Sequence, residues 1–165
     1  MERSPFFARP TSGELAHDSR TLAAVRLDSE GMYEEALQGY DRILFGQDPP
    51  AVVWGLKAQL LLKLGRHAQA LECIEIALAR GCYGDEEICV ARGICLLAVG
   101  RPEEAKGSFE RAMEIRMRPA TLALLAECFH RMGRNLEATQ TRLRALEQDP
   151  EGESLAQADE ILQGL

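Results

Sequence analysis

The chain has 165 residues, 46% of them hydrophobic, and its 26 acidic and 19 basic residues give a net charge of −7. That size and hydrophobic content are enough for one domain with a continuous core, and no shift in composition indicates a second domain. The negative charge argues against binding to nucleic acid or anionic lipid, and the longest apolar stretches, such as 94–99, are far shorter than the roughly 20 residues needed to span a bilayer.

Residues 1–16 are predicted to be a flexible arm. They contain no apolar run of signal-peptide length and are interrupted by Pro5 and Pro10, so we expect a cytoplasmic protein. The pair Phe6 and Phe7 leaves two alternatives open, a disordered arm or a lid that docks in the groove described below.

A repeat with a period of 33 to 35 residues runs through the rest of the chain. Its marker is a glycine followed five residues later by an alanine. The glycines are Gly31, Gly65, Gly100 and Gly133, and the alanines are Ala36, Ala70, Ala105 and Ala138. Seven positions before each glycine stands another small residue, at Ala24, Ala58, Gly93 and Ala126. A glycine between two segments of helical periodicity supplies the positive φ that ends one helix and reverses the chain, and the small residues let the two helices approach closely.

The repeat predicts an all-α chain made of antiparallel helix pairs, each divided near its glycine. In chain order the pairs span 17–49, 51–83, 86–118 and 119–150. Residues 153–163 follow as an amphipathic helix with Leu155, Ala158, Ile161 and Leu162 on one face. Such a helix is typical of the cap that a solenoid needs at its exposed end.

The recurring glycines, alanines and small residues resemble the tetratricopeptide repeat over residues 17–150. Trp54 stands at the aromatic position of that repeat, and Pro49 and Pro150 lie near its closing proline, although Arg20 replaces the expected aromatic residue in the first pair. The resemblance implies an alpha-alpha superhelix of about nine helices, a solenoid whose function is to bind another polypeptide.

In this family the first helix of each pair lines a concave groove. Carried over residue by residue, the resemblance assigns the partner-binding groove to Val25, Val52, Gln59, Leu62, Lys63, Val90, Ile94, Leu97, Glu127, His130 and Arg131.

The centre of this groove is apolar, at Val90, Ile94 and Leu97. These residues are a surplus, because Ala91, Cys95 and Leu96 already supply the apolar stripe of the same helix, and a helix that is apolar on more than one side is usually covered on more than one side. Either the chain itself buries the three residues, or they face solvent in an empty groove that takes an apolar or amphipathic segment of a partner.

No catalytic or metal chemistry is indicated. The three histidines have no neighbours at metal-ligand spacing, and the five cysteines form no C-x-x-C pair. We therefore expect no cofactor, no metal and no enzymatic activity, and read the cysteines as reduced and mostly buried. Seven arginines lie within 111–144, which indicates either a solvated face partly neutralised by the acidic cap or a surface for an acidic partner.

The sequence thus favours a protein-interaction scaffold or adaptor that binds a peptide segment, with homo-oligomerisation left open. One alternative is a dedicated chaperone for a secreted or membrane-inserting client, because the phrase AECFHRMGRNLEA resembles the tetratricopeptide chaperones of type III secretion. A remote alternative is a cysteine-dependent accessory domain.

Overall fold

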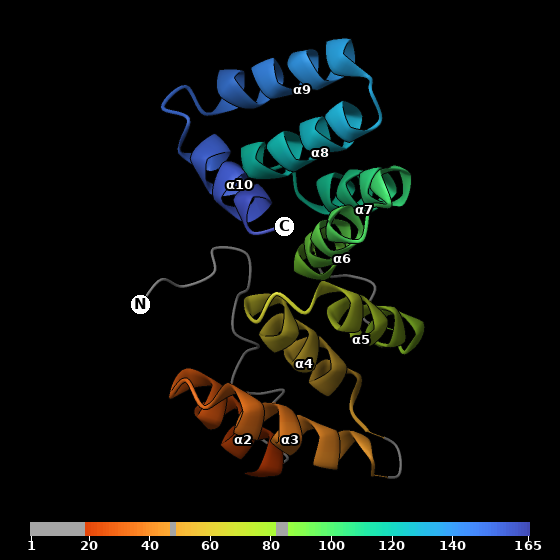
Figure 1. The fold of residues 1–165 in the computed structure, drawn as a ribbon, viewed down its shortest axis with the longest axis vertical. Coiled ribbons are helices and arrows are strands. Elements are labelled where there is room, and N and C mark those ends of the chain that lie inside the picture. The colour runs from red at the N-terminus through yellow and green to blue at the C-terminus, as the bar shows by residue number, and fades with distance from the viewer. Residues whose placement is uncertain (1–18, 47–48, 82–85) are drawn as a thin grey trace. The chain divides into compact units, whose positions relative to one another are not determined.

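The computed structural model describes residues 19–46, 49–81 and 86–165. Within these ranges the chain forms nine α-helices and no strand (Figure 1). The helices are α2 (Ser19–Ser29), α3 (Tyr33–Leu44), α4 (Ala51–Lys63), α5 (His67–Ala79), α6 (Glu86–Ala98), α7 (Pro102–Ile115), α8 (Pro119–Arg131), α9 (Asn135–Gln148) and α10 (Glu153–Gln163). None of them is long and apolar enough to cross a membrane. The predicted arm, with Phe6 and Phe7, lies outside the described residues.

The sequence predicts one domain, whereas the described residues form two compact units. The N-terminal unit holds α2 to α5 and the C-terminal unit holds α6 to α10, and the division falls within residues 82–85, which are not described. No shift in composition marks this boundary, so the sequence alone does not reveal it.

The glycine of each pair ends the first helix as the sequence predicts. Gly65 has φ +69°, its N–H donates to the carbonyl of Leu62 over 3.0 Å, and the N–H of Arg66 donates to the carbonyl of Leu61 over 2.9 Å. Gly100 has φ +75° and is followed by the same pair of bonds. This is the Schellman motif, which satisfies carbonyls that the helix end would leave unpaired.

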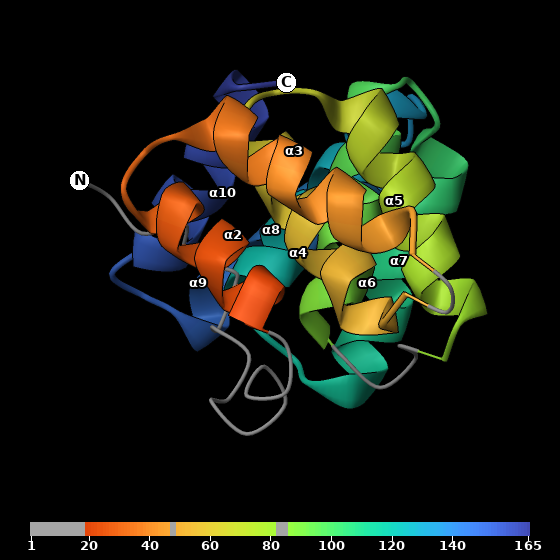
Figure 2. The ribbon, with the colours of Figure 1, turned by 90° about the horizontal axis from the view of Figure 1, so that it is seen from below.

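In the N-terminal unit α2 packs against α3 and α4 against α5, and α3 joins the two pairs by packing on α4 (Figure 2). Tyr40 and Ile74 are buried at the centre. On the surface the ammonium of Lys57 lies 2.6 Å from the carboxylate of Asp41, which links α4 to α3. The pairs are thus held by an apolar core, with ion pairs at its margin that contribute little individually.

In the C-terminal unit the pairs are α6 with α7 and α8 with α9, and α7 packs on α8. Gly93 of α6 lies directly against the buried ring of Phe109 on α7, since a Cβ atom added to Gly93 would lie 2.5 Å from that ring. At the start of α6, the buried carboxylate of Glu86 lies 2.7 Å from Nε of Arg118, which precedes α8. This ion pair ties the start of α6 to the residue that directly precedes α8, and the third and fourth pairs are in contact through α7 and α8.

We expect substitution by alanine to change the stability of this unit in opposite directions at two helix-interior glycines. Gly93→Ala forces the Phe109 ring to move and should destabilise the unit by about 1 kcal/mol, since an overpacking cost of about 1–3 kcal/mol exceeds the gain in helix propensity. Gly107 of α7 has nothing near its missing Cβ, so Gly107→Ala should stabilise it by about 0.5–1 kcal/mol. Urea unfolding of both variants measures the difference, and equal shifts would contradict the packing at Gly93.

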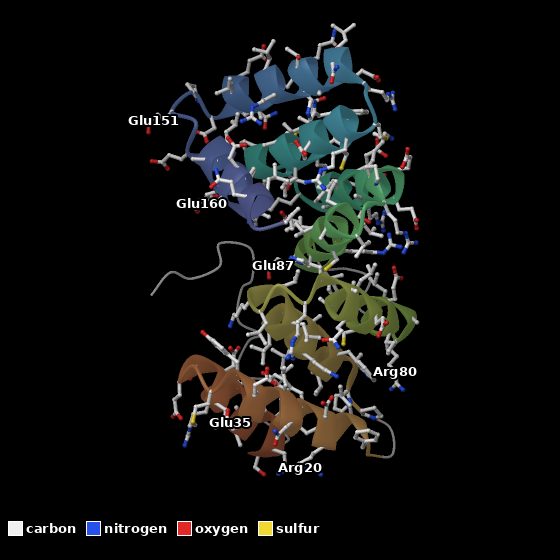
Figure 3. The ribbon with its side chains drawn as sticks, in the orientation of Figure 1. Arg20, Glu35, Arg80, Glu87, Glu151 and Glu160 are labelled. Carbon is white, nitrogen blue, oxygen red and sulfur yellow. The ribbon has the colours of Figure 1, made fainter. Side chains whose placement is uncertain are left out.

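The helix α10 packs mainly on α8 and only slightly on α9 (Figure 1). Leu155 and Ala158 are buried. Its start is fixed by Asp149, whose carboxylate accepts a hydrogen bond from the N–H of Ser154 over 2.6 Å, and this bond holds the pKa of Asp149 below its ordinary value. Figure 3 shows Glu151 and Glu160 directed away from α8. The capping helix α10 therefore covers α8 and leaves much of α9 uncovered.

Candidate partner-binding face

The predicted groove positions of the N-terminal unit lie on α2 and α4, two first helices that touch each other. Val25, Val52, Gln59 and Leu62 are all half-buried. Each therefore has part of its side chain packed on the unit and part open to contact. We call the surface formed by these four residues, with Asp28 and Lys63, the α2–α4 face.

An ion pair closes one end of the α2–α4 face. The ammonium of Lys63, near the end of α4, donates to both carboxylate oxygens of Asp28, near the end of α2, over 2.8 and 2.9 Å. The Lys63 side chain is exposed and that of Asp28 is largely covered. The pair bridges α2 and α4 and gives the apolar stretch a polar border.

The central apolar positions of the predicted groove are buried. Val90 and Leu97 are almost fully covered, and Ile94 is 6% exposed. Of the two readings of these residues, burial within the chain is therefore the one that the structure shows, and the expectation that they face solvent is wrong. The physical reason is that α6 is covered nearly all round, with even Glu86 and Gly93 buried beside its apolar residues.

The fourth pair places its predicted residues at the end of α8, where they bind their own chain. The Arg131 guanidinium donates to Glu127 over 2.8 Å and to the carbonyl of Leu97, at the end of α6, over 2.9 Å. His130 is exposed, and its Nδ1 lies 3.2 Å from the side-chain oxygen of Asn135. Arg131 thus joins α6 to α8, a structural task that its position in the repeat does not reveal.

The arginine-rich stretch is mostly neutralised by its own neighbours. Five of its seven arginines form ion pairs, namely Arg111 with Glu114, Arg118 with Glu86, Arg131 with Glu127, Arg134 with Glu137 and Arg142 with Asp159. Arg116 and Arg144 have no such partner among the residues that the structure describes. The stretch is therefore chiefly a solvated face rather than a continuous cationic surface.

The cysteines Cys73, Cys89, Cys95 and Cys128 are buried and form no disulfide within the described residues, and Cys82 lies outside them. Burial raises the pKa of Cys128 to about 12, so its thiol stays protonated and unreactive at neutral pH. No cluster of histidine, cysteine and carboxylate side chains suited to a metal ion occurs in the described part of the chain.

Two exposed leucines of α9, Leu136 and Leu143, are absent from the groove positions that the sequence predicts. Their side chains are 73% and 54% exposed. A signal for them exists in the repeat itself, because the residues at the matching positions of the other second helices are acidic with a single exception, Ala68. Leu22, one turn from Val25 on α2, is likewise exposed.

Comparison with known proteins identifies the repeat. Residues 51–79, which are α4 and α5, match the family model of the tetratricopeptide repeat. None of the curated protein sequences matches the chain.

Solved structures match nearly the whole fold. A structure of MamA from MSR-1 superimposes with a TM-score of 0.73 at 18% identity, covering 84% of each chain. YrrB, described as a tetratricopeptide-repeat protein with an unusual peptide-binding site, gives 0.74 at 21% identity and covers 91% of this chain and 79% of its own. TTC0263, a thermophilic protein of Thermus thermophilus, gives 0.63 at 20% identity, covering 93% and 84%. The predicted all-α solenoid class is confirmed: the chain carries a tetratricopeptide repeat at residues 51–79 and has the fold of tetratricopeptide-repeat proteins.

Proposed function

We propose that this chain is a protein-interaction scaffold that holds a peptide segment of a protein partner on the α2–α4 face. The observation that carries the proposal is the difference in accessibility between the two units. The groove positions of α4 are half-buried and open to contact, whereas the central apolar positions of α6 are buried.

The chemistry of the α2–α4 face suits an amphipathic segment. Val52 and Leu62 offer apolar contact, and the Gln59 amide between them can both donate to and accept from a peptide backbone. The Asp28–Lys63 ion pair would border such a segment with one charge of each sign. The fold similarity to YrrB, which is described as having a peptide-binding site, supports peptide binding as the use of this fold.

The alternative of a chaperone for a membrane-inserting client gains less support. It requires an open apolar surface large enough to shield the client, and the largest apolar set of the predicted groove is buried at Val90, Ile94 and Leu97. The α2–α4 face is small and bordered by charge, which favours a defined peptide over a broad apolar client.

Val52→Asp tests the proposal with little risk to the fold. Residue 52 lies in the first turn of α4, where a carboxylate interacts favourably with the helix dipole, but it places a charge within the apolar part of the face. Peptides selected from a displayed library on the immobilised wild-type protein should lose at least about tenfold in affinity for the variant.

Gln69→Asp is the matched control. It places the same charge in the first turn of α5, on an exposed side chain of the same unit, and should leave the affinity for the selected peptides unchanged. Equal loss in both variants, or no loss in Val52→Asp, would refute the placement of the peptide on the α2–α4 face.

A further inference from the structure

The outer side of α9 is apolar where the other second helices are acidic. Relative to the repeat alanine, Leu143 corresponds to Asp41 in α3, Glu75 in α5 and Glu110 in α7. Leu136 likewise corresponds to Glu34 in α3 and Glu103 in α7, and to Ala68 in α5. The fourth pair alone has leucine at both positions.

These leucines are exposed because nothing in the described chain stacks on α9 as α4 stacks on α3 or α8 on α7. The cap α10 packs mainly on α8 instead. Leu136 and Leu143 are seven residues apart, which places them on one side of the helix two turns from each other. Two leucines exposed by 73% and 54% in this arrangement form a short apolar seam without a partner.

The charges beside the seam are self-complementary. Glu137 and Arg144 follow the two leucines directly in sequence, so they lie along one flank of the seam, also two turns apart. If the α9 helices of two copies lie antiparallel against each other, a two-fold axis relates them. The register that sets Leu136 of one copy against Leu143 of the second copy also brings Glu137 of the first close to Arg144 of the second. The apolar contact and the ionic contact then each occur twice, as a two-fold interface requires.

The charged side chains are able to make these contacts. Arg144 has no ion-pair partner among the described residues, and Glu137 pairs only with the exposed Arg134 of its own helix within the same part of the chain. A carboxylate has enough acceptor sites to bind a second guanidinium while it keeps the first.

We propose that the outer side of α9, comprising Leu136, Glu137, Leu143 and Arg144, is the interface of an antiparallel homodimer. A 14-residue helix is only about 21 Å long, and a single helix pair buries less than the roughly 800 Å² per partner of a standard interface. The dimer is accordingly weak, with a dissociation constant on the order of 100 μM.

Sedimentation equilibrium of the full chain from about 10 μM to about 1 mM, a range that brackets this affinity, measures the association. The wild type should shift from monomer to dimer. Leu143→Asp, which restores the acid of the other three pairs, should weaken the dimer at least about tenfold, whereas Phe45→Asp, at an exposed phenylalanine after α3, should leave it unchanged. A wild type that stays monomeric, or an equal effect of both variants, overturns the proposal.

Two charge reversals test the antiparallel geometry. Glu137→Arg places two positive flanks against each other and Arg144→Glu places two negative ones, so each variant alone should dimerise several-fold more weakly than the wild type. When the two variants are mixed, each ionic contact of a heterodimer pairs an arginine of one variant with a glutamate of the other. Like charges then meet at neither contact, so the variants should form a heterodimer in preference to either homodimer. A mixture that associates no better than its components contradicts the antiparallel pairing.

Discussion

Ile94→Asp should unfold the C-terminal unit. Ile94 is 6% exposed on a helix that is covered nearly all round, and an unpaired carboxylate in such a place costs several kcal/mol whether it stays charged or takes up a proton. That cost is comparable to the whole free energy of unfolding of a small domain, about 5–15 kcal/mol. We expect a large loss of helical circular dichroism at about 25 °C and no cooperative melt for this unit.

The control for this substitution is Leu136→Asp, which introduces the same charge on the exposed side of α9 in the same unit. At low micromolar concentration its melting should stay close to that of the wild type, because exposed substitutions usually change the free energy of unfolding by no more than about 0.5 kcal/mol. If Ile94→Asp melts like Leu136→Asp, Ile94 is a groove residue and not a core residue.

Phe109→Ala should be the most destabilising truncation in the same unit. The ring is fully buried against Gly93. When the ring is removed, Gly93 has no side chain that could move into the cavity. Loss of a buried phenylalanine costs about 3–5 kcal/mol.

Urea unfolding measures this cost, and Phe45→Ala is its control because Phe45 is 92% exposed. The control should change the free energy of unfolding by less than about 0.5 kcal/mol. A second test uses Phe109→Leu, whose smaller side chain should reduce the penalty of Gly93→Ala in the double variant. Additive effects of the two substitutions would contradict the close approach of α6 and α7.

The repeat made the fold predictable because its residues act locally. A glycine with positive φ, such as Gly65 or Gly100, is required by the turn in which it lies, and a helical period follows from the residues of the helix itself. The all-α class and the antiparallel pairing could therefore be inferred before any contact was known. The division into two units could not, because no shift in composition marks residues 82–85.

The sequence could predict which side of its helix each candidate residue occupies, but not whether that side is exposed. The repeat assigns Val52 and Ile94 to the same side of their helices, yet the first is half-buried and the second is buried. Arg131 shows the same limit, since its bond to the carbonyl of Leu97 depends on how α8 meets α6. Burial is a property of the assembled helices, and a single-helix pattern contains no information about what lies opposite.

A photo-reactive benzoylphenylalanine at position 59 tests whether the partner peptide lies on the α2–α4 face. This position lies in the middle of the α2–α4 face, whereas position 69 lies on α5 of the same unit. On irradiation with a peptide selected on the wild-type protein, the side chain at position 59 should become crosslinked to the peptide and the same side chain at position 69 should not. Crosslinking at position 69 alone, or equally at both positions, would show that the peptide does not lie on the α2–α4 face.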